Sequence, residues 1–155
     1  MRFPSRLLLS VLLLAAAGCS DVTAPGELGQ LDAARARWNA QGSASYSVEI
    51  NRGCFCVLGG RRMTVTVKNG AVVAADYLDS GDPVETALLT YIPTILDLFD
   101  LIQDALNRKP ASFLAVYDPT YGYPTRIELD YSASVADDEL AITASNLLID
   151  RSVMP

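Results

Sequence analysis

Apolar side chains alternate with polar ones over several stretches of this chain, and this two-residue period constrains the fold more than any other feature. Tyr46, Val48 and Ile50 alternate with polar residues, and residues 62–68 and 125–131 repeat the pattern. A strand with this pattern buries one face and leaves the other in water. We therefore predict an antiparallel sheet that is covered on one face only.

Turn residues separate the predicted strands. Asn69-Gly70 lies between residues 62–68 and 71–78, and this dipeptide favours the two positive φ angles of a type I′ turn. The two flanking segments are therefore predicted to form a hairpin. Further strands are predicted over residues 113–117, 125–131 and 140–148.

Residues 28–41 have a helical period instead. Leu31, Ala34 and Trp38 fall on one face of this segment, and Gly42 follows in a position that favours a helix stop. We predict a short amphipathic helix there.

A second helix is predicted after Thr94, because Thr94 and Asp97 have the spacing of a capping box. Its apolar side chains recur at the spacing of one helix face. They are Ile95, Leu98, Phe99, Ile102 and Leu106. The element order α-β-β-β-α-β-β-β predicts an α+β fold, an antiparallel sheet of about six strands with two helices on one face.

Residues 1–18 are predicted to be a cleaved export signal. Two arginines and no acid precede an apolar stretch of about 11 residues, which is shorter than the ~20 residues that span a bilayer. The stretch ends in an Ala-Ala-Gly-Cys motif that resembles the lipobox of bacterial lipoproteins, with Ala16 where leucine is commonest. We expect Cys19 to carry diacylglycerol as the first residue of the mature protein, with ordinary signal cleavage as the alternative.

Residues 19–27 contain Pro and Gly and have no apolar period, so we predict a lipidated tether that reaches at most ~25 to 30 Å. Residues 28–155 follow as a single domain. In the lipoprotein pattern an Asp directly after the lipidated cysteine favours retention in the inner membrane. This chain has Ser20 at that position. The expected location is therefore the bacterial cell envelope, on the outer membrane and facing the periplasm.

The charge and residue types of the chain exclude several classes of function. Without the signal, the chain has 10 basic and 18 acidic residues, a net charge of −8, which argues against nucleic acid or anionic lipid as a partner. The chain has no histidine, so Ser-His-Asp and Cys-His catalysis in their usual forms are excluded. We assign no catalytic residue, no metal site and no cofactor besides the covalent lipid on Cys19.

Cys54 and Cys56 are the only thiols left once Cys19 is lipidated, in a compartment where disulfides form. Two thiols one residue apart form a disulfide or offer two soft ligands to a metal such as Cu(I). A structural disulfide is the favoured interpretation, and a redox role, metal binding and unpaired thiols stay open. Met63 is the only other soft donor nearby in the sequence.

Tyr117, Tyr121 and Tyr123 gather around one predicted turn, and aromatic side chains with a polar tip often line recognition surfaces. Packing of the turn itself is the favoured alternative. Calcium is a further hypothesis for an acidic group that comprises Asp118, Asp130 and residues 137–139. The D-x-D-x-D-G spacing is absent there, so a solvated acidic edge is favoured.

A set of motifs runs through nearly the whole predicted domain. It comprises Trp38, the strand at Tyr46, Cys54-Phe55-Cys56, the hairpin at 65–70, residues 93–102, Tyr117-Asp118-Pro119 and residues 121–124, 127–131 and 136–139. In these motifs and their order the chain resembles an uncharacterised bacterial lipoprotein family, domain of unknown function 6174. The resemblance supports the domain boundaries and the Cys-x-Cys as a family feature, and implies no activity.

Two functional hypotheses follow. The first is a membrane-tethered, non-catalytic module that binds an unknown protein or small molecule in the envelope, with the membrane reached through the lipid anchor. The second is a thiol-redox or copper-handling protein that acts through Cys54 and Cys56.

Overall fold

The computed structural model describes residues 26–132, 134–135 and 139–150. The predicted signal, Cys19 and most of the tether lie outside the described residues. The helical elements are α1 (Glu27–Gln41), the 3₁₀ helix η1 (Thr86–Tyr91) and α2 (Ile95–Arg108). The strands are β1 (Tyr46–Gly53), β2 (Arg62–Lys68), β3 (Ala71–Tyr77), β4 (Ser112–Tyr117), β5 (Pro124–Asp130) and β6 (Glu139–Ile149).

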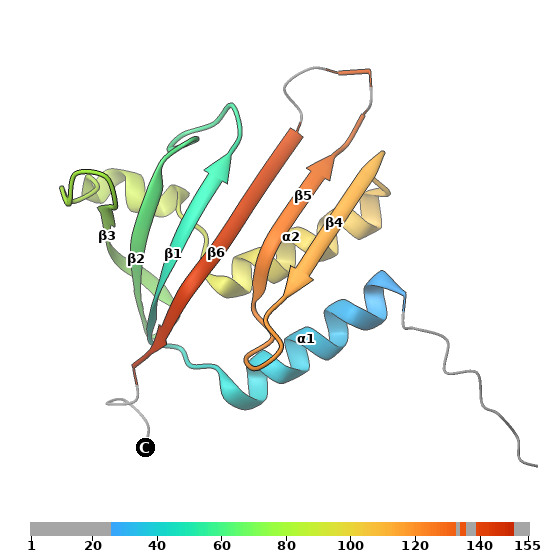
Figure 1. Cartoon of the computed structure of the whole chain (residues 1–155), viewed down its shortest axis with the longest axis horizontal. Helices are drawn as coiled ribbons and strands as arrows, with labels where there is room; N and C mark the ends of the chain where they lie inside the picture. The colour runs from blue at the N-terminus through green and yellow to red at the C-terminus, as the bar shows by residue number, and fades with distance from the viewer. Residues whose placement is uncertain (1–25, 133, 136–138, 151–155) are drawn as a thin grey trace, which may run out of the picture.

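The strands form one six-stranded antiparallel sheet in the order β3-β2-β1-β6-β5-β4 (Figure 1). The last strand, β6, lies in the centre and joins the three N-terminal strands to β5 and β4. Lys68 pairs with Ala71 across the predicted two-residue turn, where Asn69 and Gly70 have φ angles of 50° and 79°. The hairpin prediction is confirmed.

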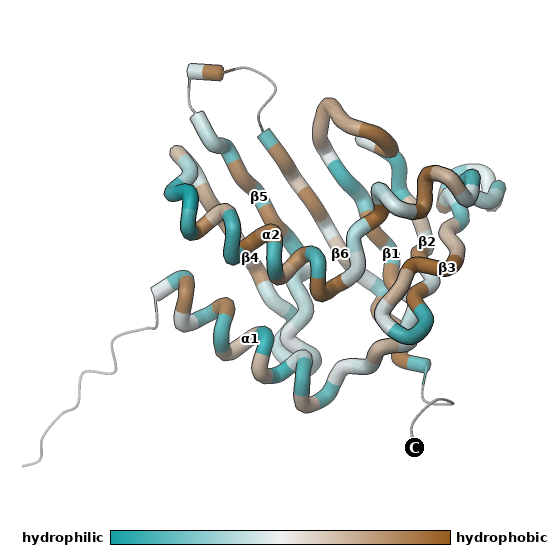
Figure 2. Tube along the Cα trace, turned by 180° about the vertical axis from the view of Figure 1, so that it is seen from behind, coloured by the Kyte–Doolittle hydropathy of each residue, from teal (hydrophilic) through white to brown (hydrophobic). Residues whose placement is uncertain are grey.

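Both long helices lie on one face of the sheet, as predicted. Figure 2 shows α1 and α2 in front of the strands, whereas Figure 1 shows the opposite, uncovered face. The side chains that point to the helices are buried on β1 at Tyr46, Val48 and Ile50, and on β2 at Met63 and Val65. The two-residue period therefore marks the core side of these strands, and the α+β prediction is confirmed.

Helix α2 buries five side chains in the core, whereas α1 buries three. The Thr94 side chain accepts a hydrogen bond from the Asp97 amide at 3.2 Å, and the Asp97 carboxylate accepts one from the Thr94 amide at 2.8 Å. This is the predicted capping box, which gives hydrogen-bond partners to two amides that have none within the helix. The buried side chains of α2 are Ile95, Leu98, Phe99, Ile102 and Ala105.

Residues 86–108 are long and apolar enough to cross a membrane by length and composition alone. The helical path is interrupted between η1 and α2, and α2 buries its apolar face in the core beneath the sheet. Packing within the domain accounts for the apolar character of this segment.

The sequence did not predict η1. Element ends otherwise differ from the predictions by about a residue, so that β5 begins at Pro124 and ends at Asp130. Tyr131 therefore lies beyond its predicted strand, half-buried, with the Arg108 guanidinium 4.0 Å from its ring centroid. Strand β6 carries an irregularity where Asn146 has a φ of 53°.

Candidate functional site

The loop between β1 and β2 holds the cysteine pair. Cys54 and Cys56 form a disulfide, with their Cα atoms 5.3 Å apart. The Gly60 amide donates to the Arg52 carbonyl at 2.6 Å, and the Gly59 amide donates to the Cys56 carbonyl at 2.9 Å. A Cβ atom at Gly59 would overlap the Cys54 carbonyl oxygen, so the loop folds back on itself only with glycine there.

This tight loop leaves its apolar side chains in water. Phe55 is 93% exposed and Val57 is 45% exposed. Cys56 is exposed as well, whereas Cys54 is half-buried. Met63, the soft donor closest in sequence, is fully buried on the helix side of β2. Among the described residues no group of three or more Cys, His, Asp or Glu is placed to hold a metal ion.

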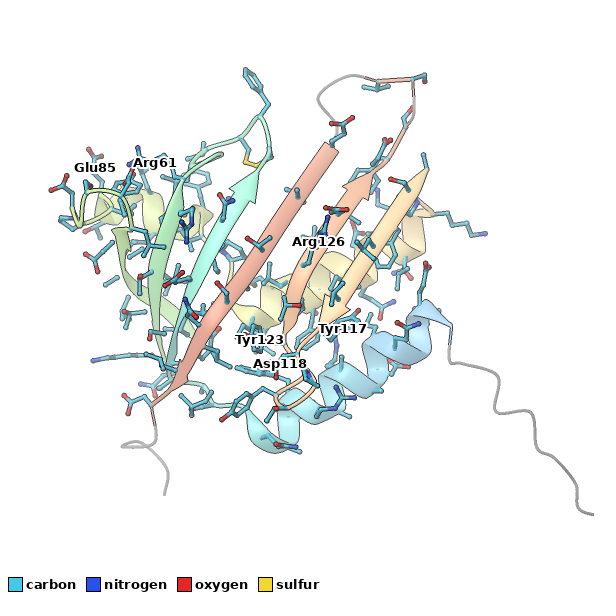
Figure 3. The ribbon with its side chains drawn as sticks, in the orientation of Figure 1. Arg61, Glu85, Tyr117, Asp118, Tyr123 and Arg126 are labelled. Carbon is cyan, nitrogen blue, oxygen red and sulfur yellow. A yellow bond between two sulfur atoms is a disulfide. The ribbon has the colours of Figure 1, made fainter. Side chains whose placement is uncertain are left out.

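The tyrosine turn lies at the opposite end of the sheet from the disulfide (Figure 3). The Asp118 carboxylate accepts hydrogen bonds from the Thr120 and Tyr121 amides at 2.9 and 2.6 Å. A Cβ atom at Gly122 would overlap the Ala34 carbonyl oxygen of α1. The turn between β4 and β5 is therefore packed directly onto α1.

These contacts agree with packing of the turn, the interpretation favoured from the sequence, more than with a tyrosine recognition surface. Tyr123 is only 6% exposed, and burial raises the pKa of its hydroxyl. The half-buried Tyr117 ring stacks on Phe99 with centroids 6.4 Å apart, and burial raises its pKa to about 12. Tyr121 is half-buried against the same core. The Tyr117 ring thus packs against α2, and Tyr121 and Tyr123 are partly and fully buried against the core.

The acidic residues considered for calcium are engaged in local structure. Asp118 closes the tyrosine turn, and the Asp130 carboxylate accepts a hydrogen bond from the Ser132 amide at 2.9 Å. Glu139 begins β6. Asp137 and Asp138 lie outside the described residues.

Arg52 is the charged residue that the sequence reasoning missed. It follows Tyr46, Val48 and Ile50 in the alternation of β1, on the face that points to the helices. Its Nη1 donates to the Tyr91 carbonyl at 2.7 Å, and its Nε is buried without a hydrogen-bond partner. Burial lowers the pKa of the guanidinium. The alternation itself is the signal that could have identified it.

A pocket of about 350 Å³ opens beside Arg52. Its walls come from the end of η1, from the segment between η1 and α2, from α2 and from β6. The lining residues are Arg52, Thr90, Tyr91, Ile92, Pro93, Asp97, Leu101, Leu140 and Ile142. The walls combine apolar side chains with polar groups, and Arg52 is the one positively charged side chain among them.

In the part of the chain that the structure describes, no carboxylate pairs with the Arg52 charge. The ion pairs found among the described residues use other arginines. Asp97 lines the same pocket, but its carboxylate accepts hydrogen bonds from the Thr94 amide and hydroxyl at 2.8 and 2.7 Å. A second pocket, of about 220 Å³ beside Trp38 and Tyr46, has no charged side chain in its lining.

The fold and these sites define a small α+β domain with a one-sided antiparallel sheet, a disulfide-closed loop and an arginine-containing pocket. The chain belongs to the Family of unknown function (DUF6174), whose model matches residues 30–149. Comparison with curated proteins and with solved structures found no match.

Proposed function

We propose that the protein is a lipid-anchored, non-catalytic binding module of the bacterial envelope, and that the pocket beside Arg52 is its ligand site. The anchor is the lipid expected on Cys19 from the Ala-Ala-Gly-Cys motif. It would hold the domain at the outer membrane, facing the periplasm. The absence of histidine from the sequence supports a binding rather than a catalytic role.

The observation that carries the proposal is the half-buried guanidinium of Arg52 in this pocket. Its Nε has no hydrogen-bond partner, and among the described residues no carboxylate pairs with it. A charge that is partly removed from water is costly unless an opposite charge or hydrogen bonds compensate it. An anionic group on a ligand would supply both. Leu101, Leu140 and Ile142 would cover an apolar portion of the same ligand.

The ligand class is therefore a small anion with an apolar body. Pockets for small molecules combine such walls with a few polar groups that fix orientation. The volume of about 350 Å³ lies near the lower end of the ~300 to 1,000 Å³ that such pockets span. This size favours a molecule of one to three rings or a short chain over a folded protein segment.

Two fluorescent probes test the proposal on a chain that begins at residue 20 and so carries no lipid. 8-Anilinonaphthalene-1-sulfonate has an anionic group, and N-phenyl-1-naphthylamine has the same rings without it. We expect Arg52→Gln to weaken binding of the sulfonate by about tenfold or more, because a hydrogen bond to a charged group contributes ~1.5 to 3 kcal/mol and ~1.4 kcal/mol is tenfold in affinity. Binding of the neutral probe should change little.

Arg126→Gln is the matched control, because Arg126 is an exposed arginine of β5 that pairs with Glu128 away from the pocket (Figure 3). It should leave both probes unaffected. If Arg52→Gln binds the sulfonate as tightly as the parent chain does, or if Arg126→Gln weakens it equally, the pocket is not the ligand site.

A further inference from the structure

Strand β4 forms one edge of the sheet, and its outer side has no strand partner among the described residues. Figure 1 shows it as the outermost strand, next to β5, with which it pairs. An edge strand presents a row of backbone amides and carbonyls to which a further strand can add. Natural sheets usually block such an edge with charged residues, with proline or with a covering segment.

The opposite edge, β3, is blocked in this way. Residues 82–84 run along part of its outer side, where Pro83 forms a bridge to the strand. The Tyr77 amide donates to the Asp82 carbonyl at 2.9 Å. The Val84 amide donates to the carbonyl of the strand at 2.8 Å. These bonds give partners to backbone groups that β3 would otherwise present to a neighbouring molecule.

Strand β4 has none of these blocking features. It contains no charged residue and no proline. Phe113 and Tyr117 pack against the core, so the alternate residues Leu114 and Val116 lie on the face that the helices leave uncovered, where they are 39% and 43% exposed. A strand added at this edge would cover both side chains and would meet no charge within β4 itself.

The charges that flank β4 differ in sign between its two ends. Lys109 precedes the strand, whereas Asp118 follows it directly. Glu27 of α1 lines a cleft together with Tyr117, the last residue of the strand. Within the described ranges neither Glu27 nor Lys109 forms an ion pair. If two identical β4 strands pair antiparallel, the basic end of each lies beside the acidic end of the other.

We infer that β4 is a dimer interface, at which the β4 strands of two copies of this chain pair antiparallel and join the two sheets into one. With the two-fold axis at Ala115, Leu114 of each copy lies opposite Val116 of the other, on the same face of the joined sheet. Lys109 of each copy lies on the side of Glu27 of the other. A patch that is complementary to itself gives a closed two-fold dimer, the commonest symmetry among oligomers. This dimer requires neither the pocket beside Arg52 nor the lipid anchor.

Analytical ultracentrifugation tests the dimer on a chain that begins at residue 20 and keeps the whole described domain. The parent chain should show a reversible equilibrium between monomer and dimer. Val116→Lys should raise the dissociation constant by about tenfold or more, because it places a charge in the apolar contact on both sides of the axis. Val73→Lys is the matched control, since Val73 is 46% exposed on the other edge strand. It should leave the dissociation constant unchanged.

A charge exchange tests the antiparallel arrangement with two exposed side chains, and so does not depend on the folding of Val116→Lys. Lys109→Glu should weaken the dimer several-fold, because it opposes Glu27 of the other copy. Adding Glu27→Lys to the same chain should restore the dimer. A parent chain that stays monomeric at every concentration would overturn the inference. So would equal weakening by Val73→Lys and Val116→Lys, or a Lys109→Glu defect that Glu27→Lys does not restore.

Discussion

At the scale of single residues, the candidate sites depend on a few positions where the side chain departs from the pattern around it. Arg52 occupies a place in the β1 alternation where the preceding residues are apolar. Gly59 and Gly122 occupy places where a Cβ atom would overlap a carbonyl oxygen. The arginine gives the pocket its charge, and the two glycines allow the disulfide loop and the tyrosine turn to close.

Gly122→Ala should destabilise the domain more than Gly81→Ala. Both glycines have positive φ angles, 83° and 76°, which cost an alanine ~1 to 2 kcal/mol. Gly81 faces open space, whereas Gly122 is packed against Ala34 and Arg37. Overpacking should add ~1 to 3 kcal/mol at Gly122. Urea unfolding measures both changes, and equal losses of unfolding free energy would show that the turn is not in tight contact with α1.

The cysteine pair should contain no free thiol in protein taken from the envelope and denatured without reductant. Mild reduction should expose two thiols and leave the urea midpoint nearly unchanged, because in the chain-entropy description a disulfide that closes a very short loop constrains the unfolded chain least. A thiol-reactive dye and an unfolding curve measure the two outcomes. Two free thiols in freshly isolated protein would contradict the structural disulfide and favour the copper-handling alternative.

At the scale of elements, the fold depends on α2 filling the space beneath the sheet. Phe99 is fully buried there, and its ring contacts the Tyr117 ring of β4 and the Arg35 guanidinium of α1. The Phe99 side chain thus connects α2 with α1 and with the edge strand β4.

Phe99→Ala should therefore cost ~3 to 5 kcal/mol of unfolding free energy, the range for large core aromatics. Leu96→Ala is the control on the same helix, because Leu96 is 50% exposed and exposed positions usually change stability by less than ~0.5 kcal/mol. A loss below ~0.5 kcal/mol for Phe99→Ala would mean that α2 does not pack as described.

Local signals predicted the elements whose structure is set by neighbouring residues. Asn69-Gly70 fixes a turn through its own φ angles, and Thr94 with Asp97 caps a helix within one turn. The helix η1 was missed because none of its residues is fully buried, and so no apolar period marks it. The pocket beside Arg52 was missed because β1, α2 and β6 build it from segments far apart in the sequence.

At the scale of the whole molecule, the two ends of the sheet differ. The end with the tyrosine turn is packed against α1, whereas the other end carries the exposed Phe55 and the cysteine loop. Arg52, which lines the proposed ligand pocket, precedes that loop in β1. In the proposed function the lipid on Cys19 holds the domain at the membrane.

Incorporation of labelled palmitate into the full-length chain tests the anchor most directly. A bacterial host that expresses the chain should attach the label, and Cys19→Ser should abolish it, because that thiol is the expected acceptor of the lipid. Cys56→Ser is the control and should keep the label, since it removes a different cysteine of the same chain. Absence of label from the parent chain, or label that survives in Cys19→Ser, would contradict a lipid-anchored protein.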